Sequence, residues 1–370
     1  MCLARRTKAN RKSIQEKAMT ISLCMIVKNE EQVLARCLDT VADLVDEIII
    51  VDTGSTDATR EVAEQYTSLI YDFEWCDDFA AARNFSFSKA TMDYIYAPDA
   101  DEVLDETNRE RFRRLKRELI PEIEIVQMHY VNANENETVL NSKTELRPKL
   151  FKRLRNFTWT DPIHEIVRLD PVVFDSDIEI LHMPMGVHGK RDFGIFKKAI
   201  ARDGRLSKRL VNMYARELLK TGNEKDFEEA RDYFKAYYEE NDGDQRKWAE
   251  CVLARHYRLE GNEYEFMKMA LCDMATTPCS EICCELGDYY MGKDDLQEGL
   301  MWYKNAAFET AAVLDIHAQG DYPLKAIVKC YEIYLEDMKK TGGKKDIELA
   351  ENLLKEARET LSSWELPDKL

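Results

Sequence analysis

A chain of 370 residues, 45% of them hydrophobic, is long enough to bury the cores of two domains. Its formal charge of -17 at pH 7 opposes binding to nucleic acids and anionic membranes, so neither is an expected partner. Apolar runs such as 47–51 and 123–128 are far shorter than the roughly 20 residues of a membrane-spanning helix, and we expect no membrane span. The 10 cysteines show no C-x-x-C spacing, which predicts reduced thiols and a cytoplasmic protein.

Strand and helix patterns alternate in the first half of the chain. Residues 1–18 are mostly basic and lack a long apolar segment, so we interpret them as a basic N-terminal tail. Beyond them, short β-branched runs alternate with apolar residues at helical spacing, which predicts parallel βαβ units. We expect an α/β domain over residues 19–193 with a mostly parallel, Rossmann-like sheet. The predicted strands are 20–27, 47–51, 69–71, 94–97, 123–131, 147–151 and 177–181, and the predicted helices between them are 33–41, 57–66 and 79–90.

Helical patterns alone fill the second half of the chain. Leu/Tyr-rich helices alternate with turns that contain a glycine, and a small residue follows each turn at a similar offset. The stretch 286–306 is most similar to a tetratricopeptide unit. The repetition predicts a second domain over residues 194–370, built from paired antiparallel helices. The turn glycines are Gly222, Gly261, Gly292 and Gly342.

Three polar segments follow predicted strands, after Val27, Val51 and Ala97. Ligands of parallel α/β sheets bind beyond these carboxyl ends, so the segments are expected to meet in a site. The segment 52–57, D-T-G-S-T-D, offers carboxylates to a base or a ribose hydroxyl, although an ordinary capped turn explains it as well. No G-x-G-x-x-G or P-loop motif occurs, which argues against a dinucleotide or P-loop fold.

A run of carboxylates ends the predicted strand 94–97. Asp99, Asp101 and Glu102 repel one another, so either a cation offsets them or they form a solvated turn that caps the next helix. Oxygen ligands suit Mg²⁺ or Mn²⁺. Arg83, in a predicted helix, either reaches a phosphate, holds this acidic loop or lies on the surface.

A histidine and a glutamate stand side by side in the stretch 160–167, T-D-P-I-H-E-I-V. Arg168 stands where a zinc protease needs its second histidine, so that chemistry is excluded. Glu165 offers a general base, which His164 can orient.

Each of the other candidate residues near this stretch has two possible roles. His182 is a candidate third metal ligand, with His188 close behind it, and a core or surface imidazole is the alternative for either. Phe157 and Trp159 offer a sugar-stacking surface, but core packing is the commoner role of such residues.

Taken in order, these motifs resemble the family 2 glycosyltransferases of the GT-A fold. The motifs are S-L-C-M-I-V-K-N-E-E, V-D-T-G-S-T-D, F-A-A-A-R-N, D-A-D-E, F-K-R-L-R-N with I-H-E, and I-L-H. The combination resembles the SunS-like bacterial subgroup, which joins a GT-A domain to tetratricopeptide-like helices and includes enzymes that glycosylate bacteriocin peptides.

The resemblance implies a role for each motif. Asp101, Asp99 and His182 would bind Mn²⁺ or Mg²⁺, and Glu165, with His164, would take the proton of the acceptor. One displacement would invert the anomeric centre, and a loop such as 132–143 would close over the donor. The nucleotide sugar would contact Val27, Asn29, Glu30, Asp52, Asp57, Arg83, Asp99 and Ala100.

The expected partners are therefore a UDP-sugar donor and a peptide, protein or glycan acceptor. The helical domain is expected either to bind the acceptor or to form a homodimer. Two alternatives remain open: a nucleotidyltransferase with the same D-x-D chemistry, and a non-catalytic helical scaffold beside a degenerate transferase domain.

Overall fold

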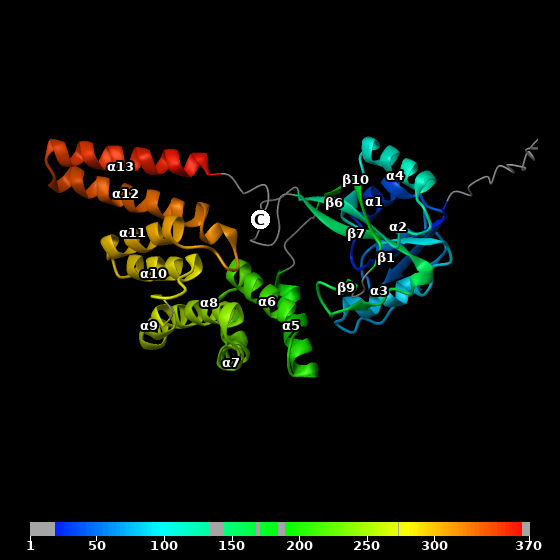
Figure 1. The fold of residues 1–370 in the computed structure, drawn as a ribbon, viewed down its shortest axis with the longest axis horizontal. Coiled ribbons are helices and arrows are strands. Elements are labelled where there is room, and N and C mark those ends of the chain that lie inside the picture. Colours follow the sequence, from blue (N-terminus) through cyan, green and yellow to red (C-terminus); the bar gives the residue numbers. More distant parts are fainter. Residues whose placement is uncertain (1–18, 133–143, 168–170, 184–188, 273, 365–370) are drawn as a thin grey trace, which may run out of the picture.

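The computed structural model describes residues 19–132, 144–167, 171–183, 189–272 and 274–364. An α/β domain comes first and a region made of helices follows, which confirms the predicted fold class (Figure 1). The expected basic tail 1–18 lies outside the described residues. Within the described ranges, no helix combines the length and the apolar character that a membrane span requires.

The α/β domain is built on one mixed sheet of eight strands in the order β3-β2-β1-β4-β7-β6-β10-β5. The first four of these are mutually parallel, and β7 runs antiparallel between β4 and β6. β10 runs parallel to β6, and β5 closes the sheet as a short antiparallel edge strand. The strands are β1 (Ile21–Val27), β2 (Glu47–Asp52), β3 (Ile70–Asp72), β4 (Tyr94–Tyr96), β5 (Glu102–Val103), β6 (Ile125–Asn132), β7 (Thr144–Lys152) and β10 (Val173–His182).

Helices cover both faces of this sheet because the side chains of a strand alternate between its faces. On β1, Leu23 and Met25 pack into one core cluster, whereas Cys24 packs into another. The first cluster includes residues of α1 (Leu34–Val41) and α4 (Glu106–Glu118), and the second includes residues of α3 (Phe79–Phe87). Because β1, β2 and β4 run parallel to one another, their carboxyl ends share one edge of the sheet, where the sequence predicted the site.

Smaller elements complete the domain. The short helix α2 (Thr59–Ala63) follows β2, the turn η1 (Arg153–Arg155) follows β7, and β8 (Trp159–Thr160) pairs with β9 (Ile166–Val167) as a two-stranded ribbon. The sequence predicts Asp57 as the N-cap of helix α2, but the helix begins at Thr59 and its N-cap is Ala58.

The helical region is a series of helices, most of which pack against a neighbour in sequence, whereas α6 packs chiefly on α8 (Figure 1). Each predicted turn glycine ends a helix or directly follows it, which confirms these turns. Gly261 needs its lack of a side chain, because it caps α8 with a φ of 76°. The helices are α5 (Gly189–Asp203), α6 (Lys208–Thr221), α7 (Glu224–Glu240), α8 (Gly243–Glu260), α9 (Glu263–Leu271), α10 (Ser280–Gly292), α11 (Leu296–Lys304), α12 (Asp321–Thr341) and α13 (Lys344–Ser363), with η2 (Asn305–Glu309) and η3 (Ile316–Ala318) between α11 and α12.

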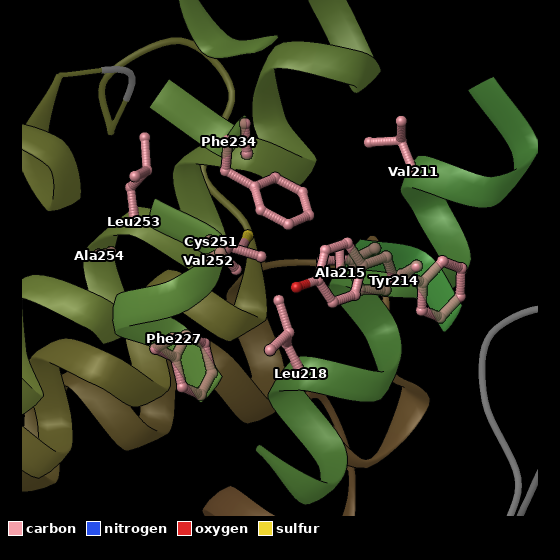
Figure 2. Packing of buried hydrophobic residues seen from close by; sticks show 14 of the residues in the cluster. Val211, Tyr214, Ala215, Leu218, Phe227, Phe234, Cys251, Val252, Leu253 and Ala254 are labelled. Atoms are coloured by element: carbon pink, nitrogen blue, oxygen red, sulfur yellow. The ribbon is translucent and has the colours of Figure 1, made fainter. Parts of the chain in front are cut away.

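The main core of this region lies between α6, α7 and α8 (Figure 2). Tyr214 and Leu218 of α6 meet Phe227 and Phe234 of α7, and all four are at most 1% exposed. Residues of α5 join the same cluster, where Phe196 stacks on Tyr214 with ring centroids 4.7 Å apart. Part of the α/β domain packs against this core.

Candidate active site

The loop after β2 is folded around Asp52. One carboxylate oxygen of Asp52 accepts hydrogen bonds from the backbone N–H groups of Gly54 and Ser55, at 3.1 and 2.9 Å. Gly54 has a φ of 98°, a conformation that favours glycine. The chain therefore turns tightly after β2, and the turn places a largely buried carboxylate at the end of this strand.

Hydrogen bonds join this loop to the loop after β1. The Asn29 side-chain oxygen accepts from the Thr56 N–H at 2.8 Å, and the Glu30 N–H donates to the Thr59 hydroxyl at 2.7 Å. Asp57 accepts from Thr59 and from the N–H of Glu31. Burial acts to raise the pKa of Asp57, but these hydrogen bonds outweigh it and lower the pKa below its ordinary value.

The two loops therefore form one hydrogen-bonded rim. Val27 closes β1 below this rim, and its carbonyl accepts from the Thr53 N–H at 3.0 Å. The predicted nucleotide-binding residues of the first two strands lie together in this arrangement.

The acidic loop after β4 is neutralised by cations of the protein itself. Asp99 accepts from Arg83 Nη2 at 2.7 Å and lies 3.5 Å from Lys149 Nζ. Lys149 also donates to Glu102 at 2.5 Å. Burial acts to raise the pKa of Asp99, but Lys149 and Arg83 lower it well below its usual range. Burial is also the main cause that raises the pKa of Glu102 to about 8, against the opposite effect of Lys149.

Asp101 lies apart from Asp99 and faces His182 at the end of β10. The Asp101 Oδ2 and His182 Nε2 atoms are 3.0 Å apart, and the side chains are 19% and 25% exposed. His182 reaches this position because it pairs with Glu102 where β10 runs beside β5. Ala100, between the two aspartates, is buried.

This pair fits a divalent cation. Two adjacent ligand atoms of an octahedral ion, each about 2.1 Å from the metal, lie about 3.0 Å apart. The observed separation of the Asp101 and His182 atoms matches that edge. Asp99 does not complete a set of three with them: among the described residues, the one cluster of three or more such side chains with all ligand atoms within 4.8 Å is Cys251, Cys279 and Glu281, in the helical region.

Glu165 reaches the same sheet edge from the β8–β9 ribbon. Its carboxylate contacts Arg83 Nε, and the two side chains are 11% and 12% exposed. Arg83 thus joins Glu165 to Asp99, and its guanidinium carbon lies 5.2 Å from the centre of the Trp159 ring. Phe157 and Trp159 are buried in the core under α3, which confirms the core-packing interpretation of these residues.

His164 points away from this site and toward the helical region. Its ring centroid lies 6.2 Å from that of Phe196, and its carbonyl accepts from Arg209 of α6. Burial, reinforced by the charge of Arg209, lowers the pKa of His164 to about 4. In the described part of the chain no hydrogen bond joins the His164 ring to Glu165, so the orienting contact of Glu165 is Arg83.

One residue of the site was missed by the sequence analysis, and two predicted features lie outside the described residues. Lys149 follows a proline in a basic stretch, and nothing in the surrounding residues predicted that it would contact the acidic loop. The expected lid 132–143 and His188 lie outside the described residues, except for the last residue of β6.

Residues 22–168 match the model of the family described as Glycosyl transferase family 2. This part of the chain is similar to glycosyl transferase family 2. The match covers β1 to β9 and thus contains every loop of the site except the end of β10. The expected resemblance is confirmed.

Curated relatives are similar to parts of this sequence. The SPbeta prophage-derived glycosyltransferase SunS of Bacillus subtilis is 30% identical over 161 residues, 40% of this chain and 38% of that protein. An uncharacterized glycosyltransferase of Rickettsia felis is 30% identical over 166 residues, 43% of this chain and 56% of that protein. A TPR repeat-containing protein of Synechococcus elongatus is 49% identical over 84 residues, 23% of this chain and 21% of that protein. The chain spans less than two thirds of each of these relatives.

Proposed function

We propose that the protein is a metal-dependent, inverting glycosyltransferase that moves a sugar from a UDP-sugar to a peptide, protein or glycan acceptor. The observation that carries the proposal is the junction at Arg83, which joins the D-x-D carboxylate Asp99 to the candidate base Glu165 at one sheet edge. The family 2 match and the similarity to the glycosyltransferase SunS support this reaction class.

The donor would lie across the ends of β1, β2 and β4. The hydrogen-bonded rim that contains Asn29, Asp52 and Asp57 offers backbone and carboxylate groups to the uracil and the ribose. A preformed rim of this kind binds its ligand with little loss of conformational entropy. Mn²⁺ or Mg²⁺ held by Asp101 and His182 would neutralise the charge that develops on the diphosphate.

The transfer is a single displacement. Glu165 takes the proton of the acceptor group, whose freed electron pair forms a bond to the anomeric carbon. The bond from that carbon to the diphosphate oxygen breaks at the same time, and UDP leaves with the electron pair. Attack opposite the leaving group inverts the anomeric centre. Arg83 fixes the Glu165 carboxylate, so the base keeps its orientation as the acceptor arrives.

UDP release from UDP-glucose or UDP-N-acetylglucosamine in the presence of Mn²⁺ tests the proposal. We expect release to cease with EDTA and in Asp101→Ala. Glu165→Gln should keep UDP binding and lose about 100-fold or more in turnover. Glu106→Gln, which alters a carboxylate that is 72% exposed on α4, is the matched control. Undiminished turnover in Glu165→Gln would remove the base assignment, and release of pyrophosphate from UTP instead of UDP release would identify a nucleotidyltransferase.

A further inference from the structure

The loop that carries Glu165 is attached to the α/β domain on one side only. Asn84 of α3 exchanges two hydrogen bonds with the backbone of Trp159, at 2.8 and 3.0 Å. The Phe79 N–H, at the start of the same helix, donates to the Pro162 carbonyl at 2.8 Å. These contacts hold the beginning of the loop. Among the described residues, the charged contact that holds Glu165 from this side comes from Arg83.

The helical region holds the other side of the same loop. Ile163 is 3% exposed and belongs to the core cluster of the helical region, with Phe196 and Tyr214. Arg209 of α6 donates to the His164 carbonyl, and its guanidinium lies 3.5 Å from the Asp161 carboxylate. The residue directly before the candidate base is therefore fixed by an arginine from the other part of the molecule.

The backbone of the loop requires such support. Asp161 has a φ of 74° and His164 a φ of 48°, and neither residue is a glycine. Such left-handed conformations are uncommon for residues with a side chain, and they persist where the surroundings fix them. At both residues the surroundings include Arg209, which contacts the Asp161 side chain and the His164 carbonyl.

We infer that the helical region completes the active site by positioning the base, and that Arg209 is the positioning residue. This inference rests on the proposed function, because it takes Glu165 as the base. The contacts of Arg209 described above are with the Asp161 carboxylate and the His164 carbonyl, and it acts on Glu165 through the backbone of His164. The helical region is on this account a structural part of the catalytic site, in addition to any acceptor surface that it provides.

The test compares Arg209→Ala and Arg209→Lys with Lys198→Ala in the full chain. Lys198 forms an ion pair of 2.7 Å with Asp77 across the same boundary between the two parts, but its partner lies outside the Glu165 loop. We expect Arg209→Ala to lower kcat for UDP release about 10- to 100-fold, because small displacements of a catalytic group cost that much. The KM for the donor and the Kd for UDP should stay within about twofold of wild type, since the nucleotide rim is untouched. Arg209→Lys should recover part of the rate.

Amide hydrogen exchange gives a readout that does not depend on catalysis. Arg209→Ala should speed exchange in residues 163–167, whereas Lys198→Ala should leave it at the wild-type rate. Faster exchange with a reduced kcat and an unchanged KM supports the inference. Unchanged exchange, or an equal loss of kcat in Lys198→Ala, overturns it. A wild-type protein that releases no UDP from any donor would instead overturn the proposed function, and the exchange comparison would still decide whether Arg209 orders the loop.

Discussion

Arg83 is the side chain on which the charges of the site depend most directly. It is 12% exposed and contacts two carboxylates, Glu165 at 11% exposure and Asp99 at 38%. Arg83→Met would leave both without this partner. Loss of one partner from a buried pair costs about 3 to 5 kcal/mol, and Glu165 should account for most of that because Asp99 is more exposed and keeps Lys149. We expect a loss of about 4 kcal/mol in the free energy of unfolding.

The double variant Arg83→Met/Glu165→Gln separates the cost of an unpaired buried charge from the cost of lost packing. Glu165→Gln alone should cost about 1 kcal/mol, because Arg83 keeps Asp99 as an ionic partner. In Arg83→Met/Glu165→Gln no buried charge remains at residue 165, so the combined cost should fall about 2 kcal/mol short of the sum. This coupling is the quantity that the contact predicts.

Urea unfolding, followed by exchange of the amides in β4 and β7, measures the stability of the α/β domain without a two-state assumption for the whole chain. Arg60→Met is the matched control, because the side chains of the Arg60–Asp72 pair are 42% and 79% exposed and water screens their interaction. Costs that add within about 0.5 kcal/mol, or an Arg83→Met loss no larger than that of Arg60→Met, would refute the buried junction.

The remaining predictions concern pH and metal. The pKa of His164 is about 4 in the folded protein, mainly because of burial, against about 6.5 in an unfolded chain. As the pH falls, residue 164 is therefore protonated in the unfolded state before it is protonated in the folded state. The free energy of unfolding decreases between about pH 6.5 and about pH 4, by at most about 3 kcal/mol. His164→Gln should unfold with a shallower dependence on pH in this window, and parallel curves for the two proteins would contradict the assignment. His182→Ala and Asp101→Asn should each weaken Mn²⁺ binding at least about 10-fold by calorimetry, whereas Asp105→Asn, which alters the cap of α4, should not.

Much of the fold could be predicted because its signals are local. The runs 20–27 and 47–51 are apolar up to a polar loop, and in the sheet they become neighbouring parallel strands whose ends meet. Gly222 and Gly342 directly follow the helices α6 and α12, so single glycine residues were enough to predict these turns. Asp57 shows the limit of such reasoning: the sequence suggests a helix cap, but its carboxylate also bonds the N–H of Glu31 and ties two loops together.

His164 and Glu165 are neighbours in sequence, which suggested one shared role, yet the fold gives them different ones. The positive φ of His164 turns the chain, and the imidazole packs toward Phe196 while the glutamate meets Arg83. Adjacent residues could be assigned to opposite sides of a loop only if that backbone conformation were known. Nothing in the sequence predicts a left-handed histidine, because the contacts that fix it come from α5 and α6, more than 30 residues further along the chain.

The acidic loop shows the same difficulty in terms of charge. The sequence left open whether a cation offsets the cluster or whether the carboxylates form a solvated turn. In the structure Lys149 is the extra residue at a register shift between β6 and β7, and it contacts both Asp99 and Glu102. A register shift cannot be read from strand alternation, so the position of this lysine was not predictable. Because Arg83 and Lys149 already neutralise Asp99, a divalent cation would have to balance only Asp101, and the histidine beside that carboxylate is the second ligand that such a cation needs.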